Sequence, residues 1–170
     1  MRPPEDLSSF LDRVESAGEL RRVKAEVNPE LEITEIVHRV LREGVNERGP
    51  SYGGPALLFE NVRGSSYPLA INIFSSQRRL EIAFGRPPAE IGSEIRGLLH
   101  DINPPSLAGL FAHRSTLWRA PKMRVRRDAH GSSQAVVETP NLDRLPILNC
   151  WPDDRGRFLT LPPIILTFIH

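Results

Sequence analysis

Proline and glycine interrupt this chain so often that only short helices and strands fit between them. The 170 residues include 16 prolines and 12 glycines. A proline inside a helix removes a backbone hydrogen bond, and a glycine there lowers helix stability. Between these interruptions apolar residues recur at regular spacing, and 39% of the chain is hydrophobic. The sequence therefore predicts many short elements around one core rather than a disordered chain.

The first 44 residues predict two helices with a strand between them. Apolar residues recur at helical spacing from Leu7 to a stop at Gly18, with Asp6 placed as the capping residue. Residues 23–27 alternate apolar and charged side chains, as a half-buried strand does. Residues 31–42 carry a second apolar helical stripe that Gly44 is expected to end.

Residues 56–105 predict two strands and then two helices. Short apolar strands are expected at 56–60 and 69–74, close enough to pair. A helix follows from a cap at Ser76 to about Phe84, and the next begins at Pro87 or Pro88 and ends before Pro104. The order α-β-α-β-β-α-α predicts an α/β (α+β) domain, a mixed sheet covered by helices.

The character of the sequence changes after residue 105. A short helix is possible at 107–111, and a short strand is expected at 135–137. Residues 140–154 form an extended, proline-rich connector, and residues 158–169 are strongly apolar. A strand of that composition needs both faces covered, yet the sequence contains no downstream partner for it. We therefore expect the chain to be cut off where a second domain begins.

Charge and cysteine content exclude several classes of protein. The formal net charge is +1, which excludes a globally basic nucleic-acid binder and an acidic tail protein. Cys150 is the single cysteine, so the chain forms no internal disulfide and no cysteine cluster for zinc. The first residues lack a signal-peptide pattern, and no apolar run reaches the ~20 residues that span a bilayer. We expect a cytoplasmic protein.

Most candidate catalytic residues have an ordinary structural explanation. No pair of the five histidines has the spacing of metal ligands, and His38 is expected at the boundary of the core. Ser132 and Ser133 lack the strand-turn-helix setting of a nucleophile, and Cys150 is expected to be a small buried side chain. The turn at Gly53-Gly54 precedes a strand, so it does not place a phosphate on a helix N-terminus.

A basic run from residue 114 to 127 is the strongest local feature. It contains six basic residues and Trp118: Arg114, Arg119, Lys122, Arg124, Arg126 and Arg127. It could bind phosphate, nucleic acid or an anionic partner domain. The even net charge favours the alternative, a solvated connector whose arginines pair with carboxylates elsewhere in the chain.

Several stretches, in order along the chain, resemble the N-terminal region of the UbiD family of decarboxylases. The similar segments are residues 6–20, 26–36, 54–62, 142–148, 150–152 and 158–162. Two departures are visible: Asn28 stands where the family usually has Asp, and Ser133-Gln134-Ala135 stands where Cys-Gln-Glu is frequent.

The resemblance implies a specific chemistry. Members of the family remove CO2 from aromatic or α,β-unsaturated carboxylic acids, including one step of ubiquinone biosynthesis. Their cofactor is prenylated FMN, made by a partner prenyltransferase and held with manganese or magnesium and with potassium. The flavin lies in a split β-barrel and acts as the electron sink, aided by an Arg and two Glu residues.

This sequence lacks the family's catalytic positions. The family's Asn-x-Gly-x-Tyr-Arg segment is missing, and so are both glutamates. Thr160 is the single position that the resemblance places near the flavin. We therefore expect an N-terminal α/β domain at residues 1–112, a connector at 113–156, and the start of a truncated barrel at 157–170. As an isolated chain it would be inactive.

Two other functions stay open. The chain could be a non-enzymatic subunit that docks through residues 140–170 on another chain, which would carry the barrel. It could also be an anion- or nucleic-acid-binding module that uses Arg114–Arg127. An unpaired strand edge would in addition favour self-association.

Overall fold

The computed structural model describes residues 2–48, 53–102, 135 and 137–157, with the backbone alone at 43–48, 101 and 102. The chain divides into two compact units, Met1–Gly85 with Asn141–His170, and Arg86–Pro140. Among the residues described, no helix is both long and apolar enough to cross a membrane.

The first unit contains one three-stranded mixed sheet in the order β1-β2-β3. Strand β1 (Leu20–Val27) pairs parallel with β2 (Ala56–Val62), and β2 pairs antiparallel with β3 (Leu69–Ile71). The predicted α+β fold with a mixed sheet is confirmed, and the predicted order of elements is the observed one.

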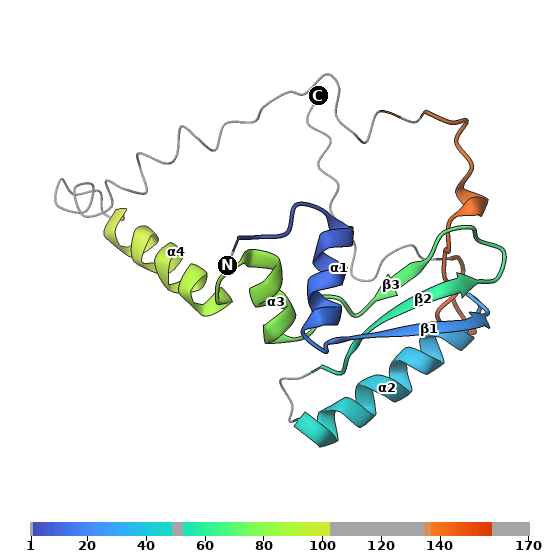
Figure 1. Cartoon of the computed structure of the whole chain (residues 1–170), viewed down its shortest axis with the longest axis horizontal. Helices are drawn as coiled ribbons and strands as arrows, with labels where there is room; N and C mark the ends of the chain where they lie inside the picture. The colour runs from blue at the N-terminus through green and yellow to red at the C-terminus, as the bar shows by residue number, and fades with distance from the viewer. Residues whose placement is uncertain (1, 49–52, 103–134, 136, 158–170) are drawn as a thin grey trace. The chain divides into compact units, whose positions relative to one another are not determined.

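Helices cover both faces of this sheet. Helices α1 (Leu7–Ser16) and α3 (Gln77–Phe84) lie on one face, and α2 (Glu32–Arg48) lies on the other (Figure 1). The first face buries a core of six residues: Phe10, Val14, Leu20, Ala56, Leu58 and Ile82. The second buries Val27, Ile33, Leu57, Phe59 and Val62. Because β2 is the central strand, its residues from Ala56 to Phe59 enter the two cores alternately, which explains this run of apolar side chains.

The caps agree with the predicted ones. Asp6 Oδ1 accepts a hydrogen bond from the Ser9 amide at 2.7 Å and begins α1. Ser76 Oγ accepts one from the Arg79 amide at 3.1 Å and begins α3, and Gly85 ends α3 in the left-handed conformation.

Three predictions about the elements are wrong. Gly44 does not end α2, which continues to Arg48, since one glycine costs a helix only about 1 kcal/mol. The strand expected at 69–74 stops at Ile71, because Asn72 adopts a positive φ of 63° and turns the chain. Ala135 and Val137 lie outside any strand, and Val137 is exposed.

The second unit is described mainly through helix α4 (Pro88–Ile102). The helix begins at a proline as predicted, and Arg86 and Glu94 form a two-bond ion pair at 2.7 Å near its start. This pair raises the pKa of the Arg86 guanidinium through its hydrogen bonds to Glu94. Two large apolar side chains of this helix, Ile95 and Leu99, are exposed.

Candidate functional site

The structure describes only part of the residues singled out from the sequence. Thr160, the basic run 114–127 and the serines at 132 and 133 lie outside the described residues, as does the apolar segment 158–169. Cys150 is buried as predicted. His38 is exposed rather than at the boundary of the core, with its Nδ1 atom 3.8 Å from Glu35 Oε2. Within the described ranges, no group of three or more His, Cys, Asp or Glu side chains could hold a metal ion.

A buried polar network joins the first strand to the third helix. Arg79 Nη1 donates to Glu19 Oε2 at 2.8 Å, and Ser76 Oγ lies 3.0 Å from the same oxygen. The Arg79 side chain is 0% exposed and the Glu19 side chain 9%. A carboxylate so enclosed has its charge balanced by the guanidinium, and no substrate can reach it. The pair is therefore part of the fold rather than a catalytic acid and base.

The same network holds the loop before β2. Arg79 Nη2 donates to the Gly54 carbonyl and to Ser75 Oγ, each at 2.8 Å. Asn72 Nδ2 donates to the carbonyls of Gly53 and Pro55 at 2.8 and 2.9 Å. These bonds satisfy backbone carbonyls that no strand partner reaches, and they fix the start of β2 against α3.

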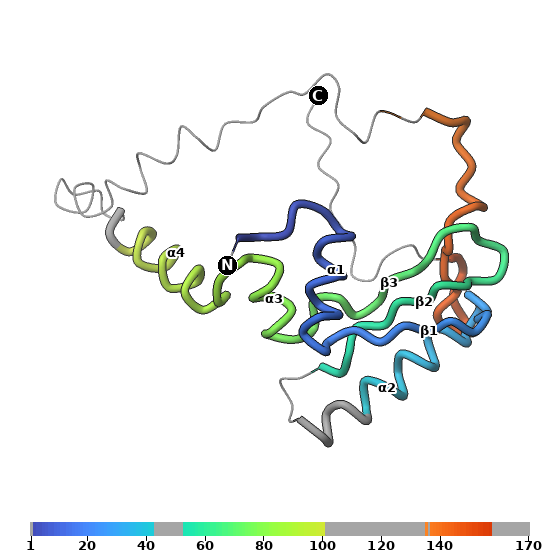
Figure 2. The backbone as a smooth tube through the Cα atoms, in the orientation of Figure 1, coloured from blue at the N-terminus to red at the C-terminus, as the bar shows by residue number. Residues whose placement is uncertain are grey.

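A junction of polar and apolar contacts lies where the chain returns to the sheet after residue 140. We call residues 141–157 the returning segment; it contains the 3-10 helix η3 (Leu142–Arg144). Asn149 and Glu30 form an isolated parallel bridge: the Leu31 amide donates to the Asn149 carbonyl at 2.9 Å, and the Asn149 amide donates to the Pro29 carbonyl at 3.2 Å. Figure 2 shows this segment reaching the end of the sheet where β1 leads into α2.

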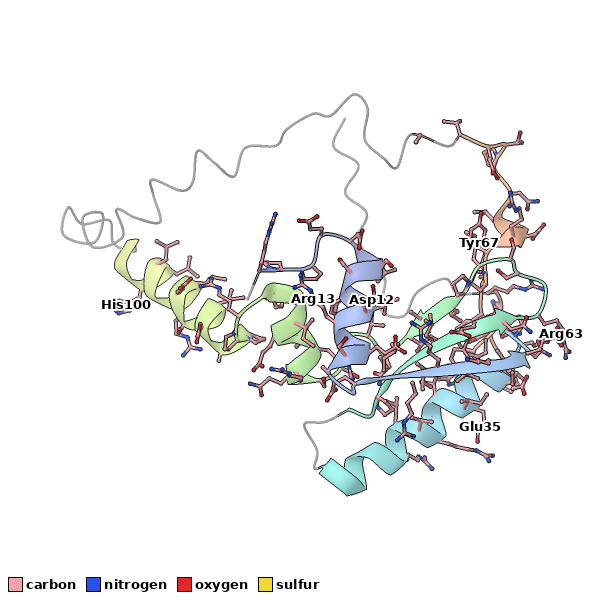
Figure 3. All side chains as sticks on the ribbon, in the orientation of Figure 1. Asp12, Arg13, Glu35, Arg63, Tyr67 and His100 are labelled. Atoms are coloured by element: carbon pink, nitrogen blue, oxygen red, sulfur yellow. The ribbon has the colours of Figure 1, made fainter. Side chains whose placement is uncertain are left out.

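Side chains reinforce this junction on both sides of the bridge. Leu148 packs against the core beneath α2. Ser65 Oγ donates to the Arg144 carbonyl at 2.8 Å, and the Arg144 guanidinium lies 5.8 Å from the centre of the Tyr67 ring. Figure 3 labels Tyr67 beside η3. The proline-rich connector expected from the sequence is thus attached to the first unit along residues 144–150.

Sequence reasoning missed both the buried polar network and the junction with the returning segment, although the sequence does contain a signal for the network. Arg79 stands three residues before the buried Ile82, on the apolar face of its helix. A charged residue in phase with an apolar stripe indicates a buried ion pair, and Glu19 is a carboxylate just before a core strand. The sequence contains no such signal for the returning segment, because nothing in its composition indicates which part of the sheet it packs against.

The two parts of the sequence match two models of one family. Residues 11–99 match the 3-octaprenyl-4-hydroxybenzoate carboxy-lyase N-terminal domain, and residues 124–168 match the Rift-related domain of the same carboxy-lyase. The returning segment lies inside the second match. The two matches follow one another in a single chain.

Relatives extend the likeness over nearly the whole chain. An uncharacterized protein of Chlamydia trachomatis is 37% identical over 158 residues, which are 92% of this chain and 25% of that protein. An uncharacterized protein of Archaeoglobus fulgidus is 35% identical over 162 residues, which are 95% of this chain and 31% of that protein. The chain thus spans about a quarter to a third of the length of the curated relatives it matches.

A solved structure shares the fold. The vanillic acid decarboxylase of Sedimentibacter hydroxybenzoicus in its closed form aligns with a TM-score of 0.59 and 24% sequence identity, over 92% of this chain and 29% of that chain. Together with the match to the N-terminal domain model over more than half of the sequence, these findings establish that the chain belongs to the UbiD family of carboxy-lyases.

Proposed function

We propose that this chain is the N-terminal part of a prenylated-flavin-dependent decarboxylase acting on aromatic or α,β-unsaturated carboxylic acids. The observation that carries the proposal is the pair of family matches, with the returning segment of the second packed on the domain of the first. In this proposal residues 1–112 are the α/β domain, 113–156 the connector, and 157–170 lead into the flavin-binding split barrel. A cytoplasmic location belongs to the same proposal.

Within the described residues, no group of three or more His, Cys, Asp or Glu side chains could hold the divalent metal. Their one deeply buried pair, Glu19 and Arg79, is enclosed and engaged by neighbouring groups. We therefore assign no chemical step to these residues. In this proposal prenylated FMN, the divalent metal and potassium are held by the part of the protein that the longer relatives have beyond this chain, with Thr160 as the one position of this chain near the flavin and with the flavin supplied by a prenyltransferase.

The test uses the chain alone and the chain with its missing part. The purified chain is mixed with prenylated FMN, desalted and inspected for flavin absorbance. We expect none to remain bound; stoichiometric flavin on the chain alone would overturn the assignment of the cofactor to the missing part. The chain is then combined with a second polypeptide, the part of the Archaeoglobus fulgidus relative that lies outside the 162 residues matched by this chain.

With both polypeptides and prenylated FMN present, CO2 release is measured on a panel of aromatic and α,β-unsaturated acids. We expect release that needs both polypeptides. A flavin-loaded complex that decarboxylates none of the panel would overturn the proposed function.

Two alternatives keep distinct predictions. A docking subunit that uses residues 140–170 would have to bind its partner without Leu148 and Asn149, because these two residues already make contacts within the chain itself. An anion-binding module predicts salt-dependent binding that falls evenly when Arg124, Arg126 and Arg127 are replaced.

A further inference from the structure

Apolar side chains are exposed along the returning segment and on the residues it contacts. We call four of them the exit patch: Leu31, Tyr67, Leu142 and Trp151. Leu142 and Trp151 belong to the segment itself. The Leu31 amide is bonded to the Asn149 carbonyl, and the Tyr67 ring lies against the Arg144 guanidinium. Each of these four side chains thus belongs to the returning segment or to a residue that the segment contacts.

The junction also fixes how the patch is presented. Bonds to Pro29 and Leu31 hold Asn149, two residues before Trp151. The Trp151 amide donates to Asp154 Oδ2 at 2.9 Å, and the Asp154 amide donates to the Trp151 carbonyl at 3.1 Å, which closes a tight turn around the tryptophan. A tryptophan and a tyrosine held by a rigid backbone are typical of the centre of an interface, because burying them costs little conformational entropy.

The sequence around the patch indicates what covers it. The returning segment lies within residues 124–168, the match to the Rift-related domain, and the relatives are three to four times as long as the part that this chain matches. Because the returning segment is part of that match, we expect the polypeptide that completes the Rift-related domain to lie beside it. Large apolar side chains that stay exposed along such a segment favour a contact with that polypeptide.

We propose that the exit patch is the surface on which the remainder of the Rift-related domain packs, with Trp151 as its central contact. This inference rests on the proposed function, because it takes the missing part of the decarboxylase as the partner. It adds which residues of this chain receive that partner.

The binding experiment compares two exposed aromatic residues of the first unit. Trp151 is 54% exposed and Phe84, on α3 and outside the patch, is 52% exposed. Calorimetry measures the Kd of the chain for the Archaeoglobus fulgidus polypeptide described above. We expect Trp151→Ser to raise the Kd about tenfold or more, and Phe84→Ser to change it less than about twofold. Circular dichroism and urea unfolding verify that both variants fold.

A fluorescence measurement checks the same contact without altering it. In a Trp118→Phe chain, Trp151 is the single tryptophan. We expect its emission to move to shorter wavelength, and its quenching by iodide to fall, when the partner is added. Equal loss of affinity in the two serine variants, unchanged emission, or no binding by the unaltered chain would each overturn the inference.

The inference and the proposed function fail in different ways. Binding through Trp151 without decarboxylation of any acid overturns the function and supports the docking surface. Decarboxylation by the mixed polypeptides, with a Kd that Trp151→Ser leaves unchanged, supports the function and overturns the docking surface.

Discussion

Arg79 and Glu19 form a fully enclosed ion pair between α3 and the start of β1, 60 residues apart in the chain, with 2.8 Å between Nη1 and Oε2. The second nitrogen of the same guanidinium holds the Gly54 carbonyl. One side chain thus connects α3 with the beginnings of β1 and β2. Since β1 and β2 are parallel and need a crossover connection, the pair fixes where both strands start.

Replacement of Arg79 tests the importance of this pair. Arg79→Met leaves the Glu19 carboxylate buried without its counter-charge, and we expect a loss of about 3–5 kcal/mol of unfolding free energy. Arg78→Met, at the exposed neighbouring position, is the matched control and should cost less than about 1 kcal/mol. Urea unfolding followed by circular dichroism measures both. Equal midpoints for the two variants would contradict the role assigned to Arg79.

The loop before β2 makes a second prediction. A Cβ atom at Gly53 would collide with the Ser75 carbonyl oxygen, whereas one at Gly64 meets nothing within 4 Å; both residues have positive φ. Gly64→Ala should cost about 1–2 kcal/mol for the conformation alone. Gly53→Ala adds a backbone clash, so we expect on the order of 3 kcal/mol or more. Thermal unfolding of the two variants measures both losses of stability. A Gly53→Ala chain as stable as the Gly64→Ala chain would refute the close packing of residue 53 against Ser75.

Acid should weaken the contact between α1 and the sheet. Hydrogen bonds from Arg22, at 2.7 Å, lower the pKa of the Glu15 carboxyl. A carboxyl whose pKa is lower in the folded state stabilises that state at neutral pH, and this contribution is lost as the pH falls through the folded pKa. The loss is expected below about pH 4.3, the usual glutamate value.

Comparison with a variant isolates this effect. Between pH 7 and pH 3 the urea midpoint of the parent chain should fall further than that of Glu15→Gln, which has no carboxyl to protonate. Glu5→Gln, at an exposed position paired with Arg2, is measured beside it as the control for the loss of a surface carboxyl. Identical pH dependence in the parent and in Glu15→Gln would rule out the assigned role of Glu15.

Local patterns predicted most of the first unit. The caps at Asp6 and Ser76 and the apolar stripes depend on residues three or four apart, so the sequence reveals them directly. The predicted end of α2 was wrong because one glycine is a weak stop signal. The early end of β3 depends on Asn72 reaching the carbonyls of residues 53 and 55, a contact that no local pattern contains.

The candidate site was less predictable for the same physical reason. Residues 29–31 and 149 meet across more than a hundred positions, and such a pairing depends on the folded sheet rather than on neighbouring residues. The position carried over from the family, Thr160, lies outside the described residues and stays a prediction. The family itself was predictable, because the matching segments follow one another in order.

Loss of the Leu148 side chain should release the returning segment. Leu148 is partly buried against the core beneath α2, so Leu148→Ala is expected to cost about 1–2 kcal/mol, below the value for a fully buried leucine. With this contact weakened, the bridge at Asn149 opens more often, and trypsin should cleave after Arg144 several times faster than in the parent chain. Leu142→Ala, an exposed position on the same segment, is the control and should leave the cleavage rate unchanged. Gel electrophoresis and mass spectrometry of timed digests measure both rates, and equal rates in the two variants would show that Leu148 does not hold the segment to the sheet.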